Sequence, residues 1–402
     1  MTPPLSMMSN TPFQFAPMPH LHFGWGIRHQ LISHLQKHYQ GRIVLITGRF
    51  LAQPGQFGAE LRDALKQTNR HVEHFTVSGE PSPDLVDTIV GQCNPDTEVV
   101  IGLGGGSVLD AAKAIAGLIP SQTSVMDYLE GVGAGKPFNV ATCPFIAVPT
   151  TAGTGSETTK NAVLSRLGEF KKSFRDNKLL AKEAWLDPEL LQSCPRDVLY
   201  ATGMDAFTQL LESYVTLKPS PITDALAWQG ITLFKGAFAA IDSDDETTRQ
   251  DAYGRLMLAA TLSGTTLANA GLGAVHGLAG PIGAFFEAPH GIVCAKLLAP
   301  ITQANIATLQ QQGTPQAQQT LQKYIQIGQL LNPNSTPDNA LAALIASLED
   351  FANRYTPQGL GQYGLQADNL DNVIQSCRSG SMLGNPVTLS DQQLYEAILK
   401  CL

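Results

Sequence analysis

The stretch Asp96–Leu118, DTEVVIGLGGGSVLDAAKAIAGL, joins a β-branched run to an alanine-rich run through three consecutive glycines. The residues at 99–101 favour a buried strand, and the alanines after Ser107 favour a helix. Glycine lets backbone N–H groups crowd around an anion, and the first turn of a helix offers unpaired N–H groups at the positive end of its dipole. The stretch therefore predicts a strand, a glycine-rich turn and a helix that can hold a pyrophosphate.

The glycine turn alone does not establish a ligand site. Close packing of a strand against a helix also uses glycines, and the spacing matches neither G-x-G-x-x-G nor the Walker motif. A second loop, PTTAGTGSETTK at Pro149–Lys160, follows an expected strand at 145–148 and is rich in hydroxyl groups. By itself it could equally be a surface loop. Two such loops at neighbouring strand ends favour phosphate and ribose contacts.

Strand-like and helix-like segments alternate through the first half of the chain. We expect strands at 22–26, 42–47 and 71–77 and helices at 27–39, 55–67 and 84–92, in addition to the elements above. This alternation predicts a parallel sheet with helical crossovers, in which ligands bind at the carboxyl ends of the strands.

The pattern becomes helical from about Asp187 onward. We expect helices at 198–215, 221–240, 247–267, 304–312, 315–331, 338–355 and 391–401. The chain therefore divides, on this expectation, into an α/β dinucleotide-binding domain over 1–187 and an all-helical domain over 188–402.

Composition limits the kinds of partner. The chain has 34 acidic and 26 basic residues, a net charge of −8, and no basic block beyond Lys171 and Lys172, so nucleic acid and anionic membranes are poor partners. The first residues lack the basic start and apolar core of a signal peptide, and no apolar run is long enough to span a bilayer. We expect a soluble, cytoplasmic protein. The six cysteines form no C-x-x-C pair, which favours reduced thiols and indicates no catalytic cysteine or zinc cluster.

A candidate metal site lies in the helical half. Asp205 and Gln209 are four residues apart in an expected helix and so lie on one face, and His276 and His290 bracket an apolar, glycine-rich segment. Two imidazoles and one carboxylate form the ligand set of an open catalytic zinc site or a non-haem ferrous site. The alternative is that both histidines are hydrogen-bonded core residues and that Asp205 acts on its helix through the dipole or capping.

Four motifs together resemble the iron-containing, or group III, alcohol dehydrogenases. They are PTTAGTGSE at 149–157, GGGS at 104–107 followed by DAAKA, ATGMDA at 201–206, and the VHG and PHG triplets around His276 and His290. The resemblance runs in order through nearly the whole chain. It implies a Rossmann-like α/β domain followed by a helical domain, the fold shared with dehydroquinate synthase, with cofactor and metal in the cleft between the domains. It also implies a metal-dependent, NAD(P)-linked dehydrogenase that moves a hydride between a small alcohol and nicotinamide C4, in a homo-oligomer such as a dimer.

The resemblance assigns roles to the residues at matching positions. The glycine turn would bind the cofactor pyrophosphate, and the threonine-rich loop would line the nicotinamide-side ribose and phosphates. The cofactor residues implied are Gly104, Gly105, Gly106, Ser107, Asp110, Thr150, Thr151, Thr154, Ser156 and Lys172. Asp205, His276 and His290 would be the catalytic metal ligands, most simply for Fe²⁺, with Zn²⁺ as the alternative.

Two positions depart from the family pattern. The fourth metal ligand, a histidine in the best-known members, is here Gln209, which would either ligate more weakly or orient a water or substrate hydroxyl. A second family histidine near the nicotinamide is here Gly280. Proton exchange would then pass through water or another group such as Glu212, although Glu212 is more simply a solvated or salt-bridged residue.

The cofactor preference is predicted from the end of the strand at 42–47. Many NAD-using relatives place there an aspartate that binds the ribose 2′-hydroxyl, whereas this chain has Gly48 and Arg49. A missing anion and an added guanidinium suit a 2′-phosphate, so we expect NADP to serve at least as well as NAD.

Two other functions remain open on the sequence. The first is a metal-independent reductase of the same fold, as in the similar maleylacetate reductases, or a dehydroquinate-synthase-like reaction, and Gln209 favours it. The second is a non-catalytic family member, which the two intact ligand loops argue against.

Overall fold

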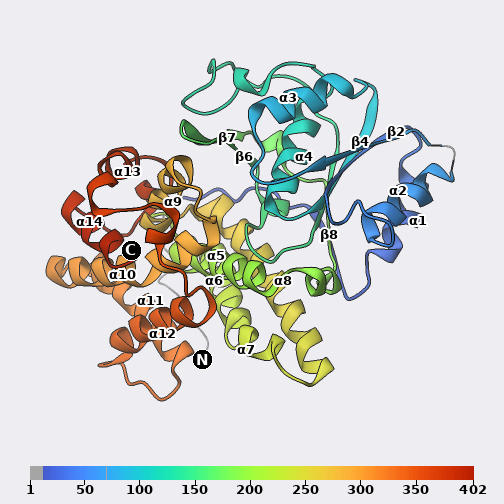
Figure 1. Cartoon of the computed structure of the whole chain (residues 1–402). Helices are drawn as coiled ribbons and strands as arrows, with labels where there is room; N and C mark the ends of the chain where they lie inside the picture. Colours follow the sequence, from blue (N-terminus) through green and yellow to red (C-terminus); the bar gives the residue numbers. More distant parts are fainter. Residues whose placement is uncertain (1–11, 69) are drawn as a thin grey trace. The chain divides into compact units, whose positions relative to one another are not determined.

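The structure is a computed structural model that describes residues 12–68 and 70–402 (Figure 1). The chain divides into two compact units: residues 17–194 form one, and residues 195–402 form the other together with the described residues before Pro17. The first eleven residues lie outside the described part, so the expectation that they are no signal peptide is untested.

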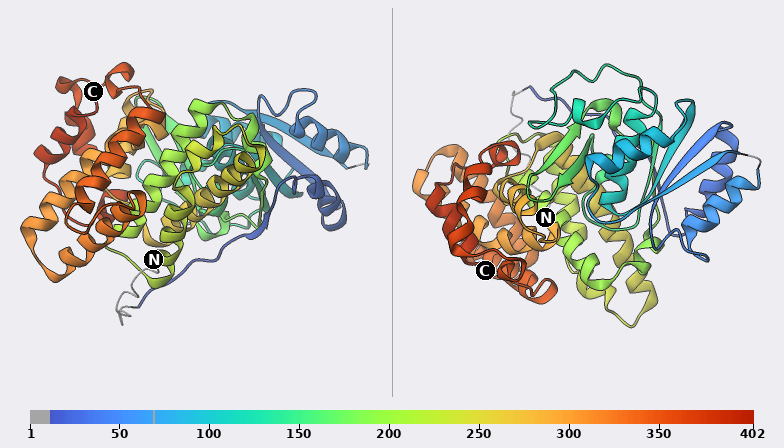
Figure 2. Two further views of the ribbon diagram at one scale, coloured as in Figure 1. Left: turned by 90° about the horizontal axis from the view of Figure 1, so that it is seen from below. Right: turned by 45° about the horizontal axis from the view of Figure 1, so that its top comes forward.

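A six-stranded parallel sheet forms the centre of the N-terminal unit (Figures 1 and 2). Its strands are β1 (His20–Phe23), β2 (Arg42–Gly48), β3 (Val72–Val77), β4 (Thr97–Gly104), β5 (Phe145–Pro149) and β8 (Glu183–Leu186). They lie in the order β1-β8-β5-β4-β2-β3, and every neighbouring pair is parallel. The expected α/β class is confirmed, with the glycine turn at the carboxyl end of a central strand.

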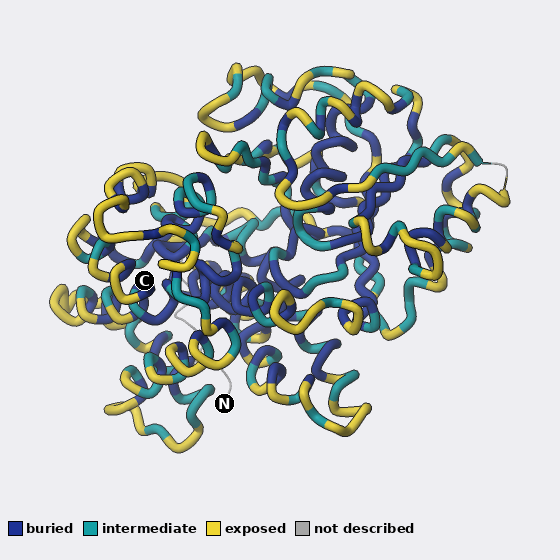
Figure 3. Tube along the Cα trace, viewed as in Figure 1, coloured by how far each residue is buried: buried dark blue, intermediate teal, exposed yellow. Residues whose placement is uncertain are grey.

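Both faces of this sheet are buried, because side chains alternate along each strand. Val44 and Ile46 of β2 lie in one hydrophobic cluster, and Ile43 and Leu45 lie in another. The first cluster includes helices α3 (Pro83–Gln92) and α4 (Gly106–Leu118), and the second includes α1 (His29–His38) and α2 (Phe57–Lys66). Figure 3 shows the central strands as buried almost along their whole length. A strand covered on both sides is hydrophobic without alternation, as the sequence of β2 shows.

Three parts of this unit differ from expectation. The strand expected at 22–26 is β1, which begins at His20 because it pairs residue by residue with β8, from His20 beside Glu183 onward. β8 itself was not predicted. The antiparallel hairpin of β6 (Asn161–Arg166) and β7 (Phe170–Arg175) was not predicted either. Its few apolar side chains pack in the hydrophobic cluster that includes α4, but charged residues separate them in the sequence.

The described residues of the C-terminal unit form helices and turns. The helices are α5 (Arg196–Val215), α6 (Pro221–Phe234), α7 (Ala237–Ile241), α8 (Glu246–Ala270), α9 (Ala274–Phe285), α10 (His290–Gln312), α11 (Pro315–Leu331), α12 (Ala340–Tyr355), α13 (Asp371–Ser376) and α14 (Asp391–Leu399). The helix expected at 304–312 is only the end of α10, and α9 was not expected. Pro281 and Pro300 lie inside these two helices, and their helix-breaking character concealed the pattern.

Helix α10 is the central helix of this unit. It contacts α5, α9, α11, α12 and α14. By length and composition α10 could span a membrane, but 67% of its apolar window is buried inside the protein. The expectation that no apolar run is long enough to span a bilayer is therefore wrong for α10 by length and composition, although such burial is what the core helix of a soluble protein shows.

A buried amino group ties the threonine-rich loop to α4 in the N-terminal unit. The Lys113 Nζ donates hydrogen bonds to Ser156 Oγ at 2.9 Å and to the Asn161 carbonyl oxygen at 2.8 Å, and it lies 3.6 Å from Asp110 Oδ1. Asp110 in turn accepts from Ser156 Oγ and from the backbone N–H of Val163. Burial raises the pKa of Asp110 and lowers the pKa of Lys113. The charge of Lys113 opposes the shift of Asp110, and the charge of Asp110 opposes the shift of Lys113.

Replacing this amino group should destabilise the N-terminal unit. Lys113→Met leaves the Asp110 carboxylate buried without its cation, so we expect a loss of about 3–5 kcal/mol in the free energy of unfolding, measured by denaturant titration. Lys172→Met is the matched control, because Lys172 is exposed on β7, and it should change stability by less than about 0.5 kcal/mol. Equal stability of the two variants would show that the buried pair contributes nothing.

Candidate metal centre and dinucleotide site

Helices α5 and α10 approach each other closely beside the candidate metal ligands. A Cβ at Gly291 would lie 2.1 Å from the carbonyl oxygen of Ala201, so any other residue would push the two helices apart. His290 immediately precedes this contact at the start of α10, and Asp205 lies about one turn beyond Ala201 on α5. The glycine of the PHG triplet therefore brings one histidine to the buried aspartate.

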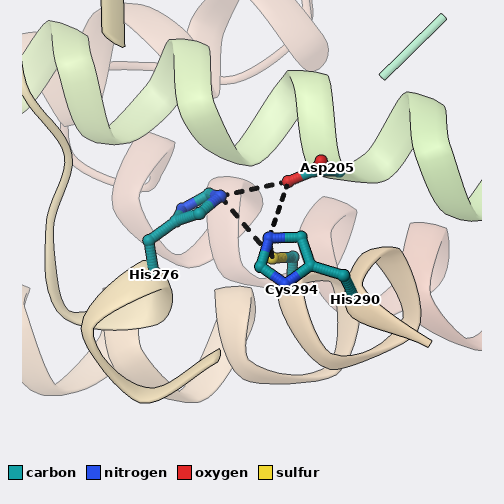
Figure 4. Close-up of side chains that lie close together, drawn as sticks. All are labelled: Asp205, His276, His290 and Cys294. Atoms are coloured by element: carbon teal, nitrogen blue, oxygen red, sulfur yellow. Dashed lines mark hydrogen bonds and ion pairs between the residues drawn. The ribbon is translucent and has the colours of Figure 1, made fainter. Parts of the chain in front are cut away.

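Four side chains from α5, α9 and α10 point toward one another (Figure 4). The His276 Nε2 lies 3.0 Å and the His290 Nε2 3.7 Å from Asp205 Oδ1. The Cys294 Sγ lies 3.7 Å from the Nε2 atom of each histidine. All four possible ligand atoms lie within 4.8 Å of one another, and among the described residues no other group of histidine, cysteine, aspartate and glutamate meets this condition.

The charges of this cluster stabilise one another in a site where Asp205 and His276 are almost inaccessible to water and the His290 side chain is 27% exposed. Burial alone would raise the pKa of Asp205, but His290 and His276 lower it to about 2. Burial would lower the pKa of His276, but Cys294, Asp205 and Glu212 raise it well above its usual value. The cluster thus combines a carboxylate with imidazoles that can exchange a proton for a metal ion.

Glu212 fixes the orientation of the His276 ring. Its Oε2 lies 2.6 Å from His276 Nδ1, and its Oε1 accepts a hydrogen bond from the Val275 N–H at 2.7 Å. A carboxylate on Nδ1 holds the proton there and leaves Nε2 free to act as a ligand. The sequence suggested Glu212 as an alternative route for protons but favoured a solvated or salt-bridged residue, and the ion pair with His276 agrees with the salt-bridged reading. The structure shows it to be buried, with its charge paired to a ring of the cluster.

Gln209 and Cys294 differ from what the sequence suggested. Gln209 is buried one turn after Asp205, and its amide oxygen accepts a hydrogen bond from Ser263 Oγ on α8 at 2.9 Å. Cys294 was set aside with the other cysteines, yet it lies in the cluster. Its signal was the spacing His290-x-x-x-Cys294, which places both side chains on one face of a helix. No C-x-x-C rule detects that spacing.

Three neighbouring strands bring the expected dinucleotide residues to one edge of the sheet. β2 ends at Gly48 before the exposed Arg49, β4 ends at the glycine turn, and β5 ends at the threonine-rich loop. The two loops touch, since a Cβ at Gly105 would lie 3.1 Å from Thr151 and a Cβ at Gly106 would lie 2.6 Å from Thr154. Glycine is required here because the loops leave no room for side chains.

The structure brings some of the expected cofactor residues to this edge and turns others away from it. Partly exposed at the edge are Gly105, Gly106, Ser107, Thr150, Thr151 and Thr154, whereas Gly104 is buried. Asp110 and Ser156 are buried and bind one another, so they hold the two loops together. Lys172 is exposed on β7. The cofactor contacts of all these residues stay predictions.

Comparison with known proteins identifies the family. Residues 19–188 match the profile of the iron-containing alcohol dehydrogenases, and residues 199–402 match the profile of the C-terminal domain of Fe-containing alcohol dehydrogenases. Long-chain-alcohol dehydrogenase 1 of Geobacillus thermodenitrificans is 36% identical over 72% of each chain. Alcohol dehydrogenase 4 of Saccharomyces cerevisiae is 29% identical over 98% of this chain and 99% of its own. The solved sulfoacetaldehyde reductase of Bifidobacterium kashiwanohense, in complex with NAD⁺, superposes with a TM-score of 0.82 at 24% identity, over 98% of this chain and 99% of its own.

The two family profiles and the named relatives thus define the class of the protein as an oxidoreductase. The chain belongs to the iron-containing alcohol dehydrogenase family. This family is NAD-linked and metal-binding, and the chain is an alcohol dehydrogenase or aldehyde reductase of that kind.

The role of Glu212 can be tested by removing its charge. In Glu212→Gln the amide NH₂ group competes for His276 Nδ1, so the ring loses its fixed tautomer and we expect metal affinity to fall about 10–100-fold. The measurement is a calorimetric titration of the metal-free protein with Zn²⁺. Glu349→Gln, an exposed position on α12, should bind as the unchanged protein does. Unchanged affinity in Glu212→Gln would contradict the orienting role.

Proposed function

We propose that the chain interconverts a small alcohol and its aldehyde or ketone with NAD(P), at a divalent metal bound by Asp205, His276 and His290. The observation that carries the proposal is the convergence of a buried carboxylate and two imidazoles on one point. Nitrogen and carboxylate donors suit Fe²⁺ or Zn²⁺, and the family description favours Fe²⁺. A bound divalent ion supplies Lewis acidity, which stabilises negative charge on the substrate oxygen.

The side chains around the ion have separate tasks. Glu212 holds the His276 ring in place, and the surrounding helices bury Asp205, Glu212 and Cys294. The glycine turn and the threonine-rich loop would hold the dinucleotide, whose nicotinamide ring would supply the hydride acceptor for the alcohol. The reaction consumes alcohol and NAD(P)⁺ and yields the carbonyl compound, NAD(P)H and one proton.

The route by which the proton leaves should differ from that of relatives with a histidine near the nicotinamide. At Gly280, the position of a family histidine, a Cβ would meet nothing within 4 Å. The open space supports exchange through water at this position. Glu212, by contrast, is occupied by His276 and the Val275 N–H, so a structural role accounts for it.

The proposal includes partners and location. We infer a homodimer in the cytoplasm that acts on small-molecule substrates without nucleic acid or membrane. The net charge of −8 and the buried α10 support a soluble protein of this kind.

Metal removal tests the proposed chemistry. Protein dialysed against a chelator should lose at least about 99% of its alcohol-oxidising rate, because charge on the substrate oxygen then lacks its counter-ion. Anaerobic Fe²⁺ or Zn²⁺ should restore the rate. Full turnover by metal-free enzyme would instead favour a metal-independent reductase of the maleylacetate reductase type. Failure of NAD(P) to raise the melting temperature would favour a non-catalytic member.

The 2′-phosphate proposal rests on Arg49, which is exposed at the end of β2 beside the glycine turn. We expect kcat/KM with NADP to equal or exceed that with NAD. Arg49→Ala should lower kcat/KM for NADP about tenfold or more, because a charge-assisted hydrogen bond of about 1.5–3 kcal/mol is lost, and should leave NAD within about twofold. A kcat/KM for NAD far above that for NADP would overturn this preference.

A further inference from the structure

We propose that Cys294 is the fourth protein ligand of the metal, so that the centre is an Asp–His–His–Cys site with sulfur in place of the family histidine. The inference rests on the proposed metal centre and deepens it. It assigns a ligand to a residue for which the sequence indicated no function.

The distances fit four donors around one ion. With Zn–N of about 2.0 Å and Zn–S of about 2.3 Å, a tetrahedral centre sets its ligand atoms about 3.3–3.6 Å apart. The separations from Cys294 Sγ to the two Nε2 atoms are each 3.7 Å, and those from Asp205 Oδ1 to the same atoms are 3.0 and 3.7 Å. The two remaining separations are no longer than 4.8 Å, so side-chain adjustments of up to about 1 Å would complete the tetrahedron.

The surroundings of Cys294 differ from those of the other buried cysteines. The thiols of Cys143, Cys377 and Cys401 donate to backbone carbonyl oxygens, as structural thiols in helices and loops do. The sulfur of Cys294, in contrast, faces two imidazole nitrogens and lies beside a carboxylate. This is a metal-ligand environment, and its side chain is fully buried there.

Helices α5 and α10 can each present two donors to the metal centre. The family pair on α5 has its donors one turn apart, at the positions of Asp205 and Gln209. On α10, His290 and Cys294 have the same spacing, and both side chains point into the cluster (Figure 4). The Gln209 amide oxygen already accepts the Ser263 hydroxyl, and a neutral amide is a weaker donor than a thiolate. The Cys294 sulfur on α10 thus supplies the fourth donor, which on α5 would have to come from the Gln209 amide.

A thiolate ligand changes the metal preference. Soft sulfur favours Zn²⁺ over Fe²⁺. Asp205 and Cys294 together also cancel the charge of a divalent ion, whereas one carboxylate with three imidazoles leaves it positive. The chain should therefore bind Zn²⁺ in preference to Fe²⁺ when both are offered.

Cobalt spectroscopy tests the sulfur directly. Metal-free full-length protein is titrated anaerobically with Co²⁺, and absorbance is followed in the visible and near-ultraviolet ranges. One equivalent should produce the visible bands of four-coordinate Co²⁺ together with an intense near-ultraviolet sulfur-to-cobalt charge-transfer band. The unchanged protein gives this readout by itself, so the test does not depend on any variant folding.

Variants locate the band. Cys294→Ser should abolish the charge-transfer band and weaken Zn²⁺ binding at least about tenfold while far-ultraviolet circular dichroism is unchanged. Cys143→Ser, a buried thiol in the N-terminal unit, is the matched control and should keep the band, as should Gln209→Ala. Retention of the charge-transfer band in Cys294→Ser would overturn the assignment, because the sulfur would then come from another residue.

The remaining outcomes separate this inference from the proposed function. Stoichiometric Co²⁺ binding and cobalt-supported turnover without a charge-transfer band would overturn the role of Cys294 and leave the proposed function standing. Failure of the protein to bind Co²⁺ or Zn²⁺ at all, with activity retained, would overturn both.

Discussion

The Asp205 carboxylate, on helix α5, is buried in the C-terminal unit, where water cannot solvate its charge. Neighbouring helices of this unit supply the groups that stabilise the charge. A buried anion is expensive unless positive groups and hydrogen bonds surround it. Those groups come from the starts of two other helices, since His276 belongs to α9 and His290 to α10. Three helices must therefore meet around one carboxylate, with His276 Nε2 at 3.0 Å and His290 Nε2 at 3.7 Å from Asp205 Oδ1.

Glycine makes that meeting possible. Besides Gly291 against Ala201, a Cβ at Gly273 would lie 2.8 Å from the Glu212 carboxylate, and one at Gly277 would lie 2.9 Å from Met382. Gly273, Gly277 and Gly291 are thus packing requirements of the segments that carry the two histidines. Their presence in a segment that looks too glycine-rich for a helix follows from the closeness of its neighbours.

The N-terminal unit uses the same physical device for a different purpose. The Lys113 ammonium and the Asp110 carboxylate are buried together and hold the threonine-rich loop against α4. Loops rich in glycine and threonine have little apolar surface that can pack against the core. Buried hydrogen bonds and the ion pair therefore hold this loop in one conformation. Such fixation would pre-orient backbone N–H groups and hydroxyls for the proposed dinucleotide and so lower the entropy lost on binding.

The sequence by itself determined the α/β class, the central strands, most of the long helices and the residue types of a metal centre, because hydrophobic period and glycine content are local properties. Only the tertiary structure decided the extents of β1 and β8, which depend on their pairing, and the existence of α9, whose proline is tolerated in its packed environment. It also decided which polar side chains meet. Ser156 turns inward to Asp110, and Glu212 and Cys294 join the histidines, although no local pattern fixes the distance between helices. The spacing of residues along the chain predicts which side chains share one face of a helix or strand. Only the packing of the elements determines which other side chains that face contacts.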